Sequence, residues 1–326
     1  MKHLFIIGNG FDCYLHKLPT EYKDFRKYIL SKYPDAEEYD ELVPESTLMP
    51  DGNEVMDIEE VAGYLTRVID DCGGDEWKDL ESYLGSSIFD TLYYDLEEVP
   101  WDGSDKQTMH AIHRNEDVAT SMRQAFGYMK QLFCDWAKDG LGSIKYNSGL
   151  IPDMLKKDYI AEVLNNGDGF LNFNYTMTLE KVYGIDPSLI CHIHGMVGDD
   201  YDDIFFGHGD RSGVPETINS IGADLYLGDL KRELRKDTDK ALNRHRDFFA
   251  KIDSDIETIH SYGFSFSDVD MPYIEEIAHR VDKNKTVWFL NMYDSTEKPD
   301  LRVKNWKSKR QKLEELGFNV QVDNRW

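Results

Sequence analysis

The segment Leu4-Phe5-Ile6-Ile7-Gly8-Asn9-Gly10-Phe11-Asp12 decides the fold expected for this chain. Four consecutive apolar residues predict a buried strand, and the glycines that follow predict a tight turn into a helix. Glycine lets a ligand approach the backbone, and N–H groups at the start of a helix favour a phosphate. A full dinucleotide fingerprint would have glycine where this chain has Cys13. We expect a ligand-binding turn at Gly8–Gly10, with Asp12 accepting from a ribose hydroxyl or capping the helix.

Further short apolar runs, rich in β-branched and aromatic residues, predict more buried strands after residue 168. These runs are 170–173, 189–193, 203–206, 258–262, 286–290 and 318–322. Apolar residues at helical spacing in 271–281 and 307–316 predict helices between the later runs. The alternation of strand and helix predicts an α/β fold with a doubly wound, Rossmann-like parallel sheet.

The long stretch after the first strand has a helical pattern instead. Apolar residues fall on one helix face in three places: Tyr22, Phe25 and Ile29; Val61, Leu65 and Val68; and Met122, Phe126, Met129 and Phe133. We predict a single α/β domain over 1–326, with its core in 1–19 and 169–326 and a large helical insertion at 20–168. The segment 42–54, rich in proline, glycine and acids, predicts a surface loop.

Composition excludes several classes of protein. Of 326 residues, 40% are hydrophobic and 13% aromatic, which argues against intrinsic disorder. The 37 Lys and Arg against 62 Asp and Glu give a net charge of −25, which makes nucleic acid an unlikely partner. The first apolar run is too short for a signal peptide, and no segment is long and apolar enough for a membrane span. Four scattered cysteines, with no CxxC pair, predict reduced thiols and a cytoplasmic, soluble protein: Cys13, Cys72, Cys134 and Cys191.

Polar residues follow three of the later predicted strands. Asn172 and Asn174 would share one face of an extended segment, which predicts a polar network or a bound ligand, or else asparagines that cap a turn. The segment Gly263–Asp270 leads a strand into a helix that Asp268 or Asp270 could cap. In a doubly wound sheet these segments all lie at the carboxyl ends of strands, where ligands bind.

Histidines form the third group. His192 and His194 alternate along one predicted strand, and His208 and Asp210 follow shortly after. Together they could hold a metal ion, or they could supply one general base, or the histidines could be ordinary core residues.

Charged residues elsewhere predict solvated helix faces. The basic stretches 231–246 and 304–312 are of this kind, and so is Glu81 beside Trp77, although Glu81 could also reach over a site.

This set of motifs resembles the AbiH-type bacteriophage abortive-infection proteins over nearly the whole chain. The resemblance rests on the opening segment, on Trp77-Lys78-Asp79-Leu80-Glu81, on 172–176, on 192–195 and on 263–270. It implies a role in bacterial defence against phage, inside the cell.

A more distant similarity, to the sirtuin-like NAD-binding fold, implies a ligand and a reaction. It would make NAD the cofactor or substrate, with Asn174 orienting a water or a ribose hydroxyl and His194 as the base. The binding residues would be Gly8, Asn9, Gly10, Asp12, Tyr175, Gly263, Ser265 and Asp268. The chain departs from that pattern in three ways: Thr176 replaces an aspartate, Asp12 replaces a small polar residue, and no paired CxxC zinc module is present.

Three functions follow from these patterns. The first is hydrolysis of NAD or a related nucleotide with His194 and Asn174, for which no metal is expected. The second is a nucleotide sensor without catalysis, and the third is a metal-dependent hydrolase or nuclease that uses His192, His194, His208 and Asp210. A homo-oligomer suits a defence protein, although no heptad or apolar stripe predicts one.

Overall fold

The computed structural model describes residues 1–39, 43–73, 80–85, 87–100, 103–146, 164, 168–213, 221–291 and 299–323. The chain forms two compact units. Unit 1 comprises Met1–Thr20, Ala137–Phe205 and Asp237–Trp326. Unit 2 comprises Glu21–Trp136 and Phe206–Lys236, so the residues after Phe205 group with the helices that follow the first strand.

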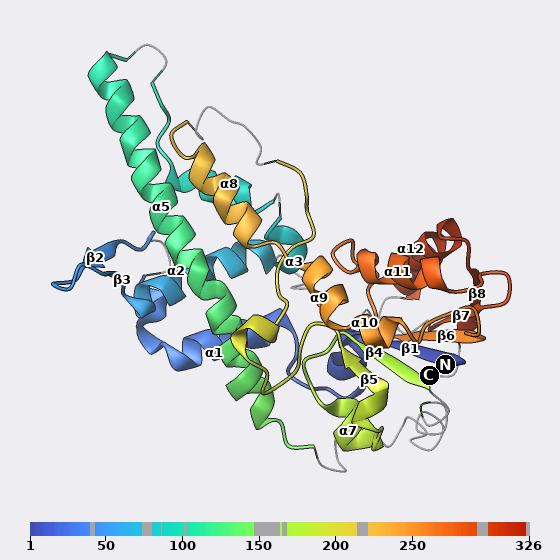
Figure 1. Cartoon of the computed structure of the whole chain (residues 1–326). Coiled ribbons are helices and arrows are strands. Elements are labelled where there is room, and N and C mark those ends of the chain that lie inside the picture. Colours follow the sequence, from blue (N-terminus) through green and yellow to red (C-terminus); the bar gives the residue numbers. More distant parts are fainter. Residues whose placement is uncertain are drawn as a thin grey trace. The chain divides into compact units, whose positions relative to one another are not determined.

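A six-stranded parallel sheet forms the core of unit 1 (Figure 1). Its strands are β1 (His3–Ile7), β4 (Gly169–Asn172), β5 (Ile190–His192), β6 (Thr258–Tyr262), β7 (Val287–Asn291) and β8 (Asn319–Asp323), in the order β5-β4-β1-β6-β7-β8. Counted along the chain, these strands have the order 3-2-1-4-5-6, which is that of doubly wound dinucleotide-binding sheets. The predicted parallel sheet is therefore confirmed, and the direction of winding reverses between β1 and β6.

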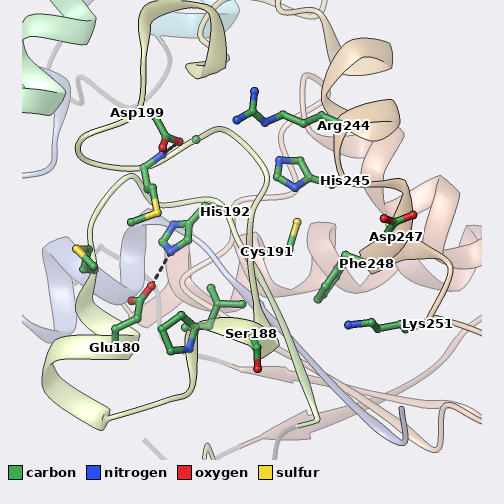
Figure 2. A pocket seen from close by; sticks show the side chains of 15 residues that line it. Glu180, Ser188, Cys191, His192, Asp199, Arg244, His245, Asp247, Phe248 and Lys251 are labelled. Carbon is green, nitrogen blue, oxygen red and sulfur yellow. Dashed lines mark hydrogen bonds and ion pairs between the residues drawn. The ribbon is translucent and has the colours of Figure 1, made fainter.

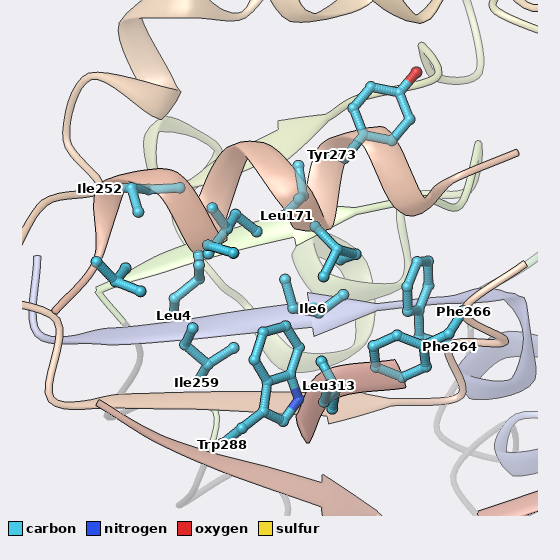
Figure 3. Packing of buried hydrophobic residues seen from close by; sticks show 14 of the residues in the cluster. Leu4, Ile6, Leu171, Ile252, Ile259, Phe264, Phe266, Tyr273, Trp288 and Leu313 are labelled. Atoms are coloured by element: carbon cyan, nitrogen blue, oxygen red, sulfur yellow. The ribbon is translucent and has the colours of Figure 1, made fainter. Parts of the chain in front are cut away.

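Both faces of the sheet are buried, as a parallel sheet requires. Alternate residues of β1 enter two different apolar clusters, with Leu4 and Ile6 on one side and Phe5 and Ile7 on the other. Figure 3 shows Leu4 and Ile6 under the helix that carries Tyr273.

Short helices cover the two faces. The Leu4 face packs against α9 (Thr238–Arg244), α10 (Arg246–Phe249), α11 (Met271–Arg280) and α12 (Pro299–Glu315). The Phe5 face packs against the π-helix η1 (Phe11–Leu15) and α7 (Thr178–Tyr183). Four further short helices are η5 (Trp136–Gly140), η6 (Leu141–Ser143), η8 (Pro187–Leu189) and η9 (Tyr201–Asp203).

Unit 2 is mainly helical, as predicted for the stretch after the first strand. Its helices are α1 (Tyr22–Lys32), η2 (Pro34–Glu38), α2 (Ile58–Gly73), α3 (Leu80–Tyr83), α4 (Ile88–Leu92), η4 (Tyr93–Asp95), α5 (Asp105–Asp135) and α8 (Asp224–Glu233). Phe25, Val61, Leu65, Phe126 and Phe133 are at most 2% exposed, so the three predicted apolar helix faces are buried. In the described part of the chain, no helix has the length and apolar character that crossing a bilayer requires.

Three local predictions were wrong. The segment 42–54 contains β2 (Ser46–Leu48), which pairs with β3 (Glu54–Met56) as an antiparallel hairpin. The run 203–206 joins no sheet, because it begins in η9 and its Phe205 N–H donates to the His194 carbonyl oxygen outside the strand ladder.

The third wrong prediction concerns the basic stretch 231–246, which is not wholly solvated. Lys231 and Lys236 are 2% and 3% exposed, and each pairs with a carboxylate of unit 2. Lys231 Nζ lies 2.8 Å from Asp210, and Lys236 Nζ lies 2.7 Å from Glu81. Glu81 is therefore an ion-pair partner instead of a solvated residue, whereas residues 74–79, with Trp77, lie outside the described residues.

The turns after β1 and β6 pack directly on one another. The Gly10 N–H donates to the Gly263 carbonyl oxygen at 2.9 Å. A Cβ on Gly10 would lie 2.9 Å from Gly263 Cα, and one on Gly263 would meet the backbone nitrogen of Phe11. Gly263 also has φ +62, so it needs glycine both for its conformation and for the contact.

Comparing Gly263 with a second glycine separates the two requirements, the positive φ and the close backbone contact. We expect Gly263→Ala to lower the free energy of unfolding by at least about 3 kcal/mol, because a backbone clash adds to left-handed strain. Gly184→Ala is the matched control, since Gly184 has φ +70 and an added Cβ would meet no atom within 4 Å. Gly184→Ala should lower the free energy of unfolding by only about 1 kcal/mol. Urea unfolding followed by circular dichroism measures both, and equal losses would contradict a role for the contact.

Candidate functional site

The turns that follow β1, β4, β5 and β6 meet at the carboxyl edge of the sheet in unit 1. The Asn174 Nδ2 donates to the Gly8 carbonyl oxygen at 3.2 Å, and the Gly10 turn contacts Gly263. The ring of Phe173 lies 4.4 Å from that of Phe264 and 5.2 Å from that of His194, between centroids. Segments far apart in the sequence therefore converge, as the order of motifs predicted.

The glycine turn uses most of its own N–H groups. Gly8 donates to the Tyr262 carbonyl oxygen at 3.0 Å, and Phe11 donates to that of Gly8 at 2.9 Å. Gly10 donates to Gly263, and the Asn9 side chain donates to the Thr20 carbonyl oxygen at 2.8 Å. A phosphate bound on this turn would have to replace some of these bonds.

Asp12 lies at the start of η1 and is completely buried. Its Oδ2 accepts a hydrogen bond from the Thr176 hydroxyl, which also lies 3.2 Å from the hydroxyl oxygen of Thr178. Its Oδ1 has no hydrogen-bond partner among the described residues. Burial raises the pKa of the Asp12 carboxyl to about 6, although the Thr176 and Thr178 hydroxyls and His192 oppose the shift.

Asn174 is held by hydrogen bonds from its backbone N–H and from its side-chain Nδ2. Its N–H donates to Asn172 Oδ1 at 3.1 Å, and its Nδ2 holds the Gly8 carbonyl oxygen. Its own Oδ1 is buried and finds no donor in the described part of the chain. Buried acceptors of this kind usually have a partner, so each marks a place where a donor is missing.

His192 forms an ion pair that the sequence did not reveal. At the end of β5, its Nε2 lies 2.9 Å from Glu180 Oε1 of α7, and both side chains are 8% exposed. Its Nδ1 lies 3.0 Å from the Asn174 carbonyl oxygen. Both contacts are hydrogen bonds only when both ring nitrogens carry hydrogen. The second oxygen of Glu180, Oε2, is buried and unpartnered among the described residues.

His194 forms a separate pair with Asp270, the residue that precedes α11. Its Nε2 lies 3.2 Å from Asp270 Oδ1, and the two side chains are 5% and 10% exposed. Aromatic rings surround the imidazole, with the centroids of Phe173, Tyr175 and Tyr273 between 5.2 and 6.2 Å away. A carboxylate on one ring nitrogen fixes the orientation and tautomer of a histidine, as in pairs that act as general bases.

The remaining predicted binding residues have other contacts. The Tyr175 hydroxyl donates to the Phe205 carbonyl oxygen at 3.0 Å. Ser265 is exposed, and its Oγ accepts from the Ser267 N–H at 3.3 Å. Asp268 is also exposed, and its carboxylate lies 2.7 Å from Lys312 Nζ of α12.

A pocket of about 380 Å³ adjoins the His192–Glu180 pair (Figure 2). One wall consists of residues from η8 and β5, including Cys191, and the opposite wall of residues 244–251. The pocket therefore follows the outer side of edge strand β5, whereas Asp12 and Asn174 are absent from its lining.

His208 and Asp210 are possible metal ligands by sequence, and both belong to unit 2. His208 Nε2 lies 2.8 Å from the Lys231 carbonyl oxygen, and its Nδ1 accepts from the Asp210 N–H at 3.1 Å. Both ring nitrogens are thus occupied. Within the described ranges, no three His, Cys, Asp or Glu side chains form a group suited to a metal ion.

The sequence identified the segments of the site but not its pairings. The sequence indicates Asp270 only as a helix cap and gives no indication of Glu180. Glu180 stands in the first turn of the helix that follows β4. That position in the first helical turn is the one signal that could have singled it out.

The raised pKa of Asp12 predicts a pH-dependent stability. Between the ordinary value of 3.8 and about 6 the folded chain binds more protons here than the unfolded chain, so this carboxyl lowers stability as pH rises. Asp12→Asn removes the ionisation. We expect the free energy of unfolding of this variant, relative to the unmodified protein, to rise by up to about 3 kcal/mol from pH 4 to pH 7.

Urea titrations at several pH values measure that difference. Asp268→Asn is the matched control, because it removes a carboxyl that is 94% exposed. A difference for Asp12→Asn that stays constant with pH would contradict the raised pKa.

Comparison with known proteins gives the family of the chain. No curated protein matches the sequence significantly. The family model described as "Bacteriophage abortive infection AbiH" matches residues 4–292. That range includes five of the six strands of the sheet and every polar residue of its carboxyl edge described above. The chain belongs to the AbiH family of bacteriophage abortive-infection proteins.

Proposed function

We propose that this AbiH protein binds a nucleotide at the carboxyl edge of its sheet and hydrolyses NAD or a related nucleotide there. The family connects the chain with abortive infection by phage. Ligands of doubly wound sheets bind outside the carboxyl ends of the strands, at the point where the strand order reverses. In this chain that point lies between β1 and β6, beside Gly10 and Gly263.

The observation that carries the proposal is a group of buried oxygen atoms that lack donors. Asp12 Oδ1, Asn174 Oδ1 and Glu180 Oε2 are buried without hydrogen-bond partners among the described residues. Burying an unsatisfied acceptor costs roughly 1–3 kcal/mol, so three of them favour a ligand that brings donors. A ribose offers two adjacent hydroxyl donors, and this supports a nucleotide in preference to a bare phosphate.

The two departures from the sirtuin-like pattern at Asp12 and Thr176 touch each other. The Thr176 hydroxyl donates to the Asp12 carboxylate. The sirtuin-like pattern has an aspartate directly after Asn-Tyr, where this chain has Thr176. Asp12, in the turn after β1, would supply the carboxylate instead. The ribose acceptor is therefore retained in a different position, which supports binding of a nucleoside.

The proposed reaction uses His194 as the base. Water attacks C1′ of the ribose that carries nicotinamide, the bond from C1′ to the ring nitrogen breaks, and nicotinamide leaves with the electron pair. His194 accepts the proton of the water, and Asp270 holds the resulting imidazolium. Asn174 orients the water or a ribose hydroxyl. The aromatic rings around His194 keep bulk water away from the oxocarbenium-like state.

A nucleotide sensor without turnover is the second candidate. The N–H groups of Gly8, Gly10 and Phe11 are engaged within the chain, and Asp12 is fully enclosed. A nucleotide would therefore have to move the turn as it binds. Coupling between binding and movement is what a sensor needs.

Release of nicotinamide from NAD by the purified protein tests the lead proposal. We expect His194→Ala and Asp270→Asn each to reduce the rate at least 100-fold, the size expected for loss of a positioned base. His279→Ala is the matched control, because His279 is exposed on α11 and should leave the rate unchanged. Circular dichroism checks that each variant is folded.

The outcome also separates the two candidates. NAD binding without any release of nicotinamide would replace the lead proposal by the sensor. Release that persists in folded His194→Ala protein would remove His194 from the mechanism, and absence of nucleotide binding by calorimetry would overturn both candidates.

A further inference from the structure

The pocket beside β5 has a position and a chemistry different from those of the carboxyl edge. It runs from Ser188 of η8 past Ile190 and Cys191 to His192, so it follows the length of the edge strand. Its opposite wall is the segment Arg244–Lys251, which includes α10 (Figure 2). A volume of about 380 Å³ is within the range of pockets that hold small molecules.

Two acids of this pocket have partners and a third is directed outward, although Glu180 Oε2 is buried without a partner among the described residues. Glu180 pairs with His192, and Asp199 Oδ2 accepts from the Met196 N–H at 2.9 Å. The Asp247 side chain is 95% exposed and lies beside Arg246. Burial raises the pKa of the Cys191 thiol to about 12, so this thiol adds no negative charge near neutral pH.

The basic groups retain free hydrogen-bonding capacity. Lys251 lines the pocket and has no ion-pair partner among the described residues. The Nε2 of His245 is buried, and none of the described groups bonds to it. Arg244 also lines the pocket, although it pairs with Asp203. Lys251 can therefore donate to a ligand, and together with Arg244 it favours an anion at the wall formed by residues 244–251.

Burial and nearby charges both act on His245. Burial, and after it the charges of Arg244, His192 and His194, lower the pKa of His245 to about 4, against the opposing effect of Asp199. Near neutral pH this imidazole is therefore neutral, and it can donate to an anion through whichever ring nitrogen carries the hydrogen.

The rest of the lining is apolar and suits a flat ring. Phe248 of α10 lies in the pocket, and Met177, Met196 and Ile190 also line it. Methionine and phenylalanine side chains adapt to the face of a ring, and stacking of a base on an aromatic side chain contributes roughly 1–3 kcal/mol.

We propose that this pocket is a second ligand site, which binds a nucleoside monophosphate with its phosphate at Lys251, His245 and Arg244 and its base against Phe248. His192 joins this site to the carboxyl edge, because one ring nitrogen contacts Glu180 in the pocket and the other contacts the Asn174 carbonyl oxygen. A ligand that displaces Glu180 would thus alter how Asn174 is held. This coupling rests on the proposed function, whereas binding in the pocket does not.

Calorimetric titration of the full-length protein with AMP tests the binding. We expect AMP to bind, adenosine to bind at least tenfold more weakly, and Lys251→Met to weaken AMP binding at least tenfold through loss of a charge-assisted hydrogen bond. Lys307→Met is the matched control, because Lys307 is exposed on α12 outside the pocket, and it should bind AMP unchanged.

The side-chain resonance of His245 gives a second measurement. It is assigned by its loss in His245→Gln protein, and it should shift on addition of AMP. Absence of AMP binding, adenosine binding as tight as that of AMP, or unchanged affinity in folded Lys251→Met protein would each overturn the proposal.

A variant of the carboxyl edge distinguishes failure here from failure of the proposed function. Asp12→Asn should leave AMP binding in the pocket intact. If Asp12→Asn abolishes AMP binding and Lys251→Met does not, AMP occupies the carboxyl edge, and the second site is overturned while nucleotide binding at the edge gains support.

Discussion

The hydrogen bond from the Gly10 N–H to the Gly263 carbonyl oxygen is the constraint on which the site depends. It holds together the turns on the two sides of the point where the strand order reverses. Neither residue can carry a Cβ without a backbone clash. Once these turns are joined, the Gly8 carbonyl oxygen accepts from Asn174, and Asp12 in the first turn of η1 accepts from Thr176. One backbone contact thus helps to position side chains that follow two strands, β1 and β4.

Two buried oxygen atoms at this edge, Asp12 Oδ1 and Asn174 Oδ1, have no hydrogen-bond partner among the described residues. A chain with net charge −25 has many carboxylates, but most can remain in water. Asp12 cannot, and its pKa of about 6 expresses the cost of burial. Folding retains this group together with the unpartnered Asn174 Oδ1, although a buried apolar residue at either position would avoid that cost. Stability alone does not explain such an arrangement, whereas the nucleotide proposed above would supply the missing donors.

The sequence predicts the strands and helices well because hydrophobic periodicity and turn residues at strand ends are local signals. Every predicted strand except 203–206 lies in the sheet, and the helical faces after β1 are buried. The run 203–206 failed because an apolar stretch can be buried under other elements without joining the ladder. Lys231 and Lys236 were assigned to solvent because their partners, Asp210 and Glu81, are distant in the sequence. Pairings across long separations have no local signature.

The same limit explains what sequence reasoning could and could not say about the site. It identified Asn174 and His194 by their place after strands, yet their partners Gly8 and Asp270 are 166 and 76 positions away. The departures at Asp12 and Thr176 show the point most clearly. Taken separately, each departs from the sirtuin-like pattern, whereas in the structure the Thr176 hydroxyl donates to the Asp12 carboxylate. A substitution can therefore be judged only with the residue that it touches, and under the proposed function this pair would supply the acceptor for a ribose hydroxyl.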